Sequence, residues 1–126
     1  MKPTRRLRDL LASEDILVSP GVYDGYSIRL VEKMGFKTAC TTGAGLANSR
    51  MGYEDVGLMG LTDNLDACRM IAGCVSIPVM ADADTGYGTP ATVWHTTRQF
   101  EDAGVAGINI EDQVSPKRCG HMAGKD

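Results

Sequence analysis

The stretch that decides the fold runs from Ile77 to Gly88 and reads IPVMADADTGYG. Its first half is a short apolar run that predicts a buried strand, and its second half is abruptly polar and rich in glycine. Thr89 and Pro90 then supply an N-cap and a first-turn proline, which predict a helix to about residue 103. A strand, a polar loop and a helix in this order form one unit of a parallel α/β sheet.

The same order of elements recurs on both sides of this unit. We expect strands at 16–18, 38–41, 77–81 and 105–110, and helices at about 4–13, 24–34, 61–73 and 90–103. In the last helix Val93, Thr97 and Phe100 are expected to face inward. This alternation predicts a parallel sheet with right-handed crossovers, as in a doubly wound fold or a (β/α)8 barrel. In both folds the functional residues lie just beyond the carboxyl ends of the strands.

The composition of the 126-residue chain is that of one globular domain, with 43% hydrophobic and 23% charged residues. A net charge of -3 without a basic stripe argues against nucleic acid and membrane surfaces as partners, and no apolar run approaches the roughly 20 residues of a membrane span.

Four cysteines without a Cys-x-x-Cys pair indicate a reducing, cytosolic setting rather than a zinc ribbon or a disulfide framework. Basic residues near the N-terminus are followed by Asp9, Glu14 and Asp15, which favours a solvated helix face over a targeting segment.

Carboxylates follow several of the predicted strands. Asp82 and Asp84 leave one strand, Glu111 leaves the next, and Asp55 in the long loop before residue 60 is a further candidate. Such a cluster, with no compensating lysine expected nearby, is costly unless a cation neutralises it, and oxygen ligands suit magnesium or manganese. The alternative is that these side chains cap helices or lie in solvent.

Two further segments are candidates for binding or chemistry. Residues 42–45 read Thr-Gly-Ala-Gly, whose hydroxyl and backbone N–H groups suit a small carboxylate or phosphate, although a plain tight turn fits equally well. Cys119 lies among Lys117, Arg118 and His121 in a glycine-containing loop, where the pKa of a thiol can be tuned. Cys40, Cys68 and Cys74 are read as core residues, and His95 as a helix-surface residue.

These motifs together resemble the isocitrate lyase and phosphoenolpyruvate mutase superfamily. The resemblance rests on residues 20–24 (PGVYD), 42–45 (TGAG), 82–88 (DADTGYG), 110–113 (IEDQ) and 117–121 (KRCGH), and it covers nearly the whole chain. The sequence is similar to 2-methylisocitrate lyase, 2,3-dimethylmalate lyase, oxaloacetate acetylhydrolase and carboxyphosphonoenolpyruvate mutase. Thr42, Ala44 and Asn109 stand where many methylisocitrate lyases have serine, glycine and histidine, which leaves the substrate open.

The resemblance implies a fold, a reaction and a role for each motif. The fold would be the N-terminal half of a (β/α)8 barrel over residues 1–126, and the reaction a magnesium-dependent carbon–carbon cleavage of a 2-hydroxy di- or tricarboxylate. Asp84 would be the direct metal ligand, with Asp55, Asp82 and Glu111 holding the ion largely through water. Thr42, Gly43 and Ala44, with Tyr23 nearby, would bind the pyruvate-like end of the substrate. Cys119 would be the acid/base on a mobile loop that also carries Lys117, Arg118, Gly120 and His121.

The length of the chain limits this expectation, because a barrel of this type needs about 250 residues. A half-barrel leaves edge strands and an apolar inner face unpaired, which favours association into a homo-oligomer. Three alternatives therefore stay open beside the lyase: an acetylhydrolase, a phosphonate-forming mutase, and a chain that is inactive until another polypeptide segment completes it. The mutases of the phosphonopyruvate type lack the loop motif of residues 117–121, so the resemblance favours a lyase or the acetylhydrolase.

Overall fold

The computed structural model describes residues 1–13 and 16–126 and contains a four-stranded parallel sheet. Glu14 and Asp15, which we cited against a targeting segment, lie outside the described residues. The strands are β1 (Gly21–Val22), β2 (Ala39–Thr41), β3 (Val79–Asp82) and β4 (Gly107–Asn109). Each strand pairs in parallel with the next one along the chain. Because a doubly wound sheet reverses its strand order, this consecutive order confirms the predicted first four units of a (β/α)8 barrel.

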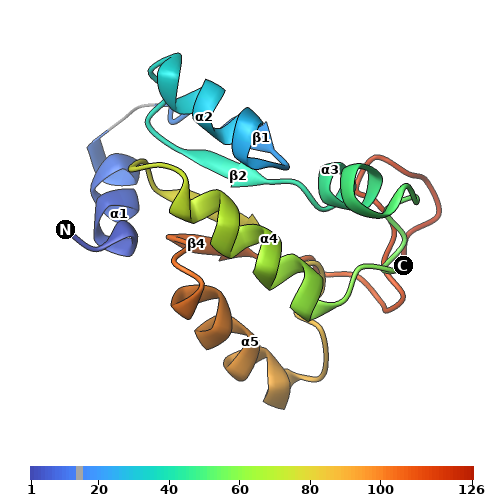
Figure 1. Cartoon of the computed structure of the whole chain (residues 1–126). Coiled ribbons are helices and arrows are strands. Elements are labelled where there is room, and N and C mark those ends of the chain that lie inside the picture. Colours follow the sequence, from blue (N-terminus) through green and yellow to red (C-terminus); the bar gives the residue numbers. More distant parts are fainter. Residues whose placement is uncertain (14–15) are drawn as a thin grey trace.

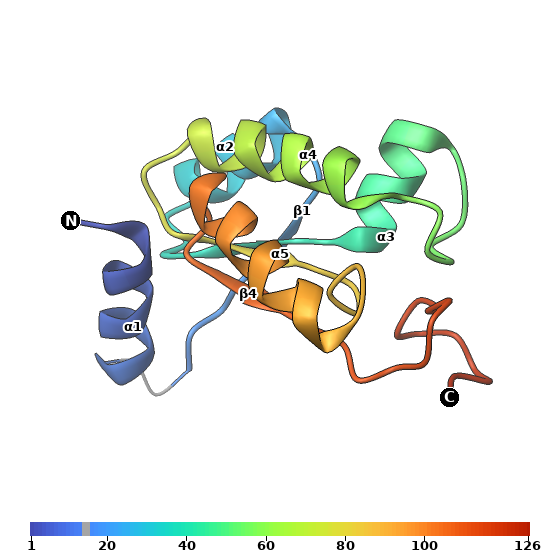
Figure 2. The ribbon, with the colours of Figure 1, turned by 90° about the horizontal axis from the view of Figure 1, so that it is seen from below.

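Helices cover one face of the sheet and one of its ends. Helices α2 (Gly25–Lys33), α4 (Leu61–Gly73) and α5 (Pro90–Asp102) lie in this order across the outer face (Figures 1 and 2). Helix α1 (Pro3–Ser13) lies at the end where the strands begin (Figure 2). Its buried Leu7 is close to Gly107. The basic side chains of α1 are exposed, as predicted. Within residues 1–13 and 16–126, no helix is both long and apolar enough to cross a membrane.

The core lies between the sheet and these helices. One apolar cluster joins Val22, Ile28 and Ile71, and a second is centred on Phe100 and includes Cys68. Burying each large apolar side chain contributes about 1.5–3 kcal/mol, so these clusters hold the helices on the sheet. Polar residues lie outside these clusters, at the carboxyl ends of the strands.

Helix α2 illustrates how local sequence sets an element's bounds. The side chain of Asp24 accepts a hydrogen bond from the backbone N–H of Ser27 at 2.7 Å, and the Ser27 hydroxyl accepts one from the N–H of Asp24 at 3.1 Å. Gly35 follows the helix in the left-handed region, with φ 87°. This capping box and glycine stop confirm the predicted helix.

The predicted first strand is wrong. Ile16 and Val18 are 82% and 57% exposed, and pairing starts only at Gly21. The backbone N–H of Cys40 donates to the carbonyl of Pro20, so the ladder to β2 fixes where the strand begins. A short apolar run in a sequence does not show which of the residues near it will pair with another strand.

Two other expectations also need correction. The inward residues of α5 are Thr96 and Phe100, whereas Thr97 is exposed and Val93 is only partly buried. The glycine-rich segment after β2 is helical: it forms α3 (Gly43–Leu46), which continues into a π-helical turn, η1 (Ala47–Met51). The loop that carries Asp55 therefore begins only at Gly52.

Candidate active site

Asp82 joins two strand ends at the carboxyl edge of the sheet. It is the last residue of β3, and its carboxylate accepts hydrogen bonds from the N–H groups of Gly43 at 2.8 Å and Asp84 at 3.2 Å. A Cβ atom on Gly43 would lie 2.8 Å from Asp82 Oδ2, so only glycine permits this close approach. The aspartate is thus fixed between the segment after β2 and its own loop.

Asp84 is the most enclosed carboxylate of the site. Its backbone adopts the left-handed region with φ 47°, and its carbonyl accepts the N–H of Glu111 at 2.7 Å. The Tyr87 hydroxyl donates to Asp84 Oδ2 at 2.9 Å. Burial raises the pKa of Asp84, against the opposing effect of Lys117 and Tyr87.

Lys117 lies inside the carboxylate cluster, which corrects the expectation that no lysine compensates it. Its ammonium nitrogen is 2.6 Å from Asp84 Oδ1 and 2.7 Å from Asp55 Oδ1, and its side chain is 3% exposed. Burial alone would lower the pKa of Lys117, but the ion pairs with Asp55 and Asp84 raise it overall. Three loops therefore meet on one internal cation.

Glu111 stands at the rim of this cluster. One of its carboxylate oxygens accepts a hydrogen bond from Gln113 Nε2 at 2.6 Å, and the side chain of Gln113 also bonds the backbone of Arg118. Burial raises the pKa of Glu111, as do the nearby carboxylates, while Lys117 opposes the rise. Gln113 thus connects the end of β4 to the loop that follows.

The loop of residues 115–121 brings its main chain to the cluster. The N–H of Cys119 donates to the carbonyl of Asp55 at 3.0 Å, and Cys119 Sγ lies 3.8 Å from His121 Nδ1. Arg118 and His121 are exposed, and a Cβ on Gly120 would meet nothing within 4 Å. The thiol and the imidazole are therefore neighbours on an open loop beside the carboxylates.

The glycine-rich segment is occupied by contacts within the protein. Thr42 Oγ1 accepts the N–H of Gly45 at 3.2 Å as the N-cap of α3, and the N–H of Gly43 binds Asp82. A Cβ on Gly45 would lie 3.0 Å from the Cβ of Tyr23, which places Tyr23 against this segment. Substrate binding by Tyr23, Thr42, Gly43 and Ala44 stays a prediction.

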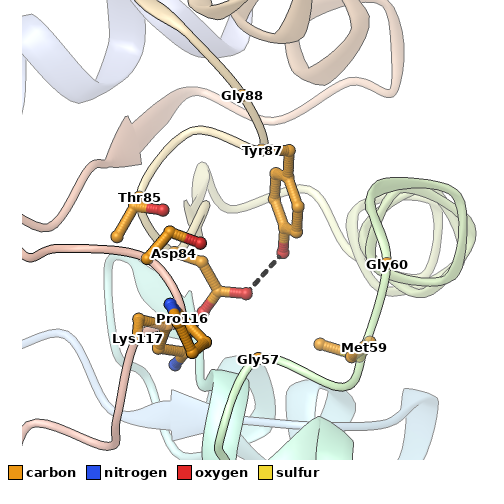
Figure 3. Close-up of a pocket in the computed structure, with 10 residues that line it drawn as sticks. Gly57, Met59, Gly60, Asp84, Thr85, Tyr87, Gly88, Pro116 and Lys117 are labelled. Carbon is orange, nitrogen blue, oxygen red and sulfur yellow. Dashed lines mark hydrogen bonds and ion pairs between the residues drawn. The ribbon is translucent and has the colours of Figure 1, made fainter.

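A cavity opens beside Asp84 (Figure 3), and its volume is about 490 Å³. Its walls include Met59, Tyr87, Pro116 and Lys117. Pockets for small molecules commonly measure about 300–1,000 Å³, so this volume is sufficient for a small organic acid. The cavity lies between the loop before α4 and the loop after β4.

The carboxylates suit a hard cation by their chemistry. All four candidate ligands offer oxygen, and Lys117 already places a positive charge between two of them. Asp84 Oδ1 is buried and, among the described residues, has an ion pair but no hydrogen bond of good geometry. No three Asp, Glu, His or Cys side chains form a metal-binding group within residues 1–13 and 16–126. A magnesium ion is compatible with these donors only if the Lys117 ammonium moves away from Asp55 and Asp84.

The sequence reading missed Asn64 and Tyr87 as parts of this site. Asn64 on α4 donates hydrogen bonds to the carbonyl of Asp82 and to the Tyr87 hydroxyl, each at 2.7 Å. The sequence does point to Asn64. It lies three residues after Leu61 and four before Cys68, so it falls on the same, core-facing side of the helix as these two apolar residues.

Both the sequence and the fold of the chain match known proteins. Residues 7–125 match the family described as phosphoenolpyruvate phosphomutase. The chain is similar to 2,3-dimethylmalate lyase of Eubacterium barkeri, with 40% identity covering 100% of the chain and 44% of that relative. It is also similar to 2-methylisocitrate lyase of Aeropyrum pernix, with 43% identity covering 98% of the chain and 40% of that relative.

A solved structure of oxaloacetate acetylhydrolase, in complex with the inhibitor 3,3-difluorooxalacetate, has the same arrangement of elements. Its TM-score is 0.94 at 44% identity, over 99% of this chain and 43% of the other. The chain spans less than half of the length of these relatives.

Proposed function

The chain belongs to the phosphoenolpyruvate phosphomutase family, and we propose that it forms the metal- and carboxylate-binding part of a carbon–carbon lyase. The substrate class is a 2-hydroxy di- or tricarboxylate of the methylisocitrate or dimethylmalate type, cleaved to pyruvate or a related oxoacid and a second carboxylate. The observation that carries this proposal is the buried Asp84, which shares the ammonium of Lys117 with Asp55 at the carboxyl end of the sheet. The named lyase relatives support the substrate class.

Magnesium, or manganese in its place, is the cofactor that we propose for this site. Asp84 would hold it directly, and Asp55, Asp82 and Glu111 would hold it largely through water. When bound, such an ion acts as a Lewis acid that favours the alkoxide of a 2-hydroxy acid.

The chain's own residues supply the other parts of the reaction. We assign to Thr42, Gly43 and Ala44 the orientation of the carboxylate end of the substrate; in support, this segment lies next to Asp82. Breaking the carbon–carbon bond leaves a carbanion that is delocalised into a carboxylate and needs a proton. We assign the donation of this proton to the Cys119 thiol, whose neighbour His121 lies 3.8 Å away.

Hydrolysis of oxaloacetate is the second candidate function. The observation in its favour is the TM-score of 0.94 with an oxaloacetate acetylhydrolase at 44% identity. A mutase reaction is less favoured, because the 117–121 loop motif belongs with the lyases and the acetylhydrolase by resemblance.

The assembly state is part of the proposal. Among the described residues β1 and β4 each pair with one neighbour, so both edges of the sheet have unpaired backbone groups. We propose that further strands, from more of the same protein or from a second copy, complete the sheet, and that the chain works as a homo-oligomer in a reducing, cytosolic setting. A chain measured without such completion would bind ligands and show no turnover.

The test is a set of assays with magnesium present and absent. Release of pyruvate from 2-methylisocitrate or 2,3-dimethylmalate that depends on magnesium supports the lyase, and release of oxalate from oxaloacetate alone supports the acetylhydrolase. Without turnover, calorimetric binding of Mg²⁺ and of oxalate would support a binding part that needs completion. Absence of Mg²⁺ binding would refute the metal assignment.

A further inference from the structure

Asn64 is a fully buried polar side chain in the core-facing surface of α4. Its two amide hydrogens are used in bonds to the carbonyl of Asp82 and the hydroxyl of Tyr87, each at 2.7 Å. Its oxygen accepts a bond from Cys68 Sγ at 3.3 Å. A buried amide costs free energy unless its groups are paired, and here both N–H groups are paired with the site, while the oxygen is paired within α4.

The hydroxyl of Tyr87 passes this constraint to Asp84. A phenol has one hydrogen to donate, and it is directed to Asp84 Oδ2 at 2.9 Å. Because Asn64 donates to this same oxygen, the phenol's own hydrogen must point to another acceptor, and Asp84 is that acceptor. The result is a chain of two hydrogen bonds from α4 to the buried carboxylate.

The loop between Asp82 and Tyr87 needs such support. Asp84 and Tyr87 have φ values of 47° and 59°, in the left-handed region that side chains with a Cβ rarely adopt. This conformation costs roughly 1–2 kcal/mol per residue, so surrounding contacts must maintain it. Asn64 holds the loop at both ends, through the Asp82 carbonyl and the Tyr87 hydroxyl.

We propose that Asn64 is a positioning residue that sets the orientation of the Asp84 carboxylate through Tyr87. This inference rests on the proposed function, in which Asp84 holds the metal. In this proposal a helix residue that has no access to solvent affects cation binding at the strand ends.

The experiment compares Asn64→Leu with Thr38→Val in the full chain. Thr38 is a matched control, because it is also fully buried and donates to a sheet carbonyl, that of Pro78 at 2.9 Å, ahead of β2 and away from the site. We expect Asn64→Leu to weaken Mg²⁺ affinity by about 10-fold to 100-fold, as loss of the partners of ligand residues typically does. Thr38→Val should lose stability and keep its Mg²⁺ affinity within about twofold.

A second variant and a metal-free measurement separate the outcomes. Tyr87→Phe removes only a hydroxyl, and it should weaken Mg²⁺ affinity in the same direction as Asn64→Leu. Without metal, trypsin should cleave after Lys117 faster in Asn64→Leu than in Thr38→Val, because a displaced Asp84 releases the lysine. Equal cleavage rates, or unchanged Mg²⁺ affinity in both site variants, would overturn the proposal. Failure of the wild type to bind Mg²⁺ would refute the metal assignment alone, and trypsin cleavage would still decide the role of Asn64.

Discussion

Replacing Lys117 with methionine removes the ammonium between Asp55 and Asp84 and keeps most of the side chain's length. The side chains of the three residues are 3%, 11% and 8% exposed, so water screens the two ion pairs only weakly. Removing one partner of a buried pair typically costs about 3–5 kcal/mol, because the remaining charge is left buried without compensation. We therefore expect Lys117→Met to lower the free energy of unfolding by an amount in this range at neutral pH.

The stability that Lys117→Met loses should depend on pH. Burial already raises the pKa of Asp84, and Lys117 opposes that rise, so the variant should have a still higher pKa at Asp84. A carboxyl whose pKa is raised in the folded state binds a proton more readily when folded than when unfolded. The deficit of the variant should therefore be full at neutral pH and shrink as the pH falls through the raised pKa of Asp84.

Magnesium should restore more stability to the variant than to the wild type, because the competing ammonium is gone. A ligand at 100 times its dissociation constant adds about 2.7 kcal/mol. Urea unfolding followed by circular dichroism at pH 5 to 8, with and without MgCl₂, measures both effects. Arg69→Met is the matched control, since the Arg69–Asp66 pair is exposed and should contribute about 0–1 kcal/mol. A loss for Lys117→Met as small as that of the control, without pH dependence, would refute the buried ion pairs.

Three other substitutions test the remaining parts of the site. Gly43→Ala places a Cβ 2.8 Å from Asp82 Oδ2 and should weaken Mg²⁺ binding measured by calorimetry; unchanged affinity would show that the backbone yields there at no cost. Asp84→Ala should abolish Mg²⁺ binding, and equal affinity in wild type and variant would make the carboxylates purely structural. Cys119→Ser, in a form of the protein that turns over substrate, should lose several orders of magnitude in kcat because a hydroxyl is a much weaker acid than a thiol of free pKa about 8.5. Turnover within about tenfold of wild type would remove Cys119 from the mechanism.

The features that depend on local sequence were predictable. Asp24 and Ser27 form the capping box within one turn, and Gly35 ends the same helix because it adopts a positive φ. The polar residues after successive strands were expected at one edge of the sheet, and Gly43, Asp82 and Asp84 do meet there. Parallel strands impose this proximity whatever path the loops take.

The features that depend on long-range pairing were not predictable. Lys117 stands beside Arg118 in a polar loop, so its sequence context indicates a solvated charge, whereas it is buried against Asp84 and Asp55, 33 and 62 residues earlier. The sequence around Thr42 predicts a turn or an anion-binding loop, because a helix of four residues is too short to show a periodic apolar pattern after its N-cap. In both cases the deciding partner is set by the tertiary fold.

The separation between the apolar clusters and the carboxylate edge has a consequence for how this family changes over time. Stability comes from side chains such as Ile28, Ile71 and Phe100 between helices and sheet, whereas the candidate chemistry lies on loops that follow the strands. Substitutions at exposed positions beyond β2 and β4, away from the buried Lys117 ion pairs, are thus expected to alter the reaction with little loss of stability. This separation agrees with the names of the relatives, which include lyases and an acetylhydrolase although each is at least 40% identical to this chain. We expect a change of substrate among them to require few substitutions, concentrated beyond the strand ends.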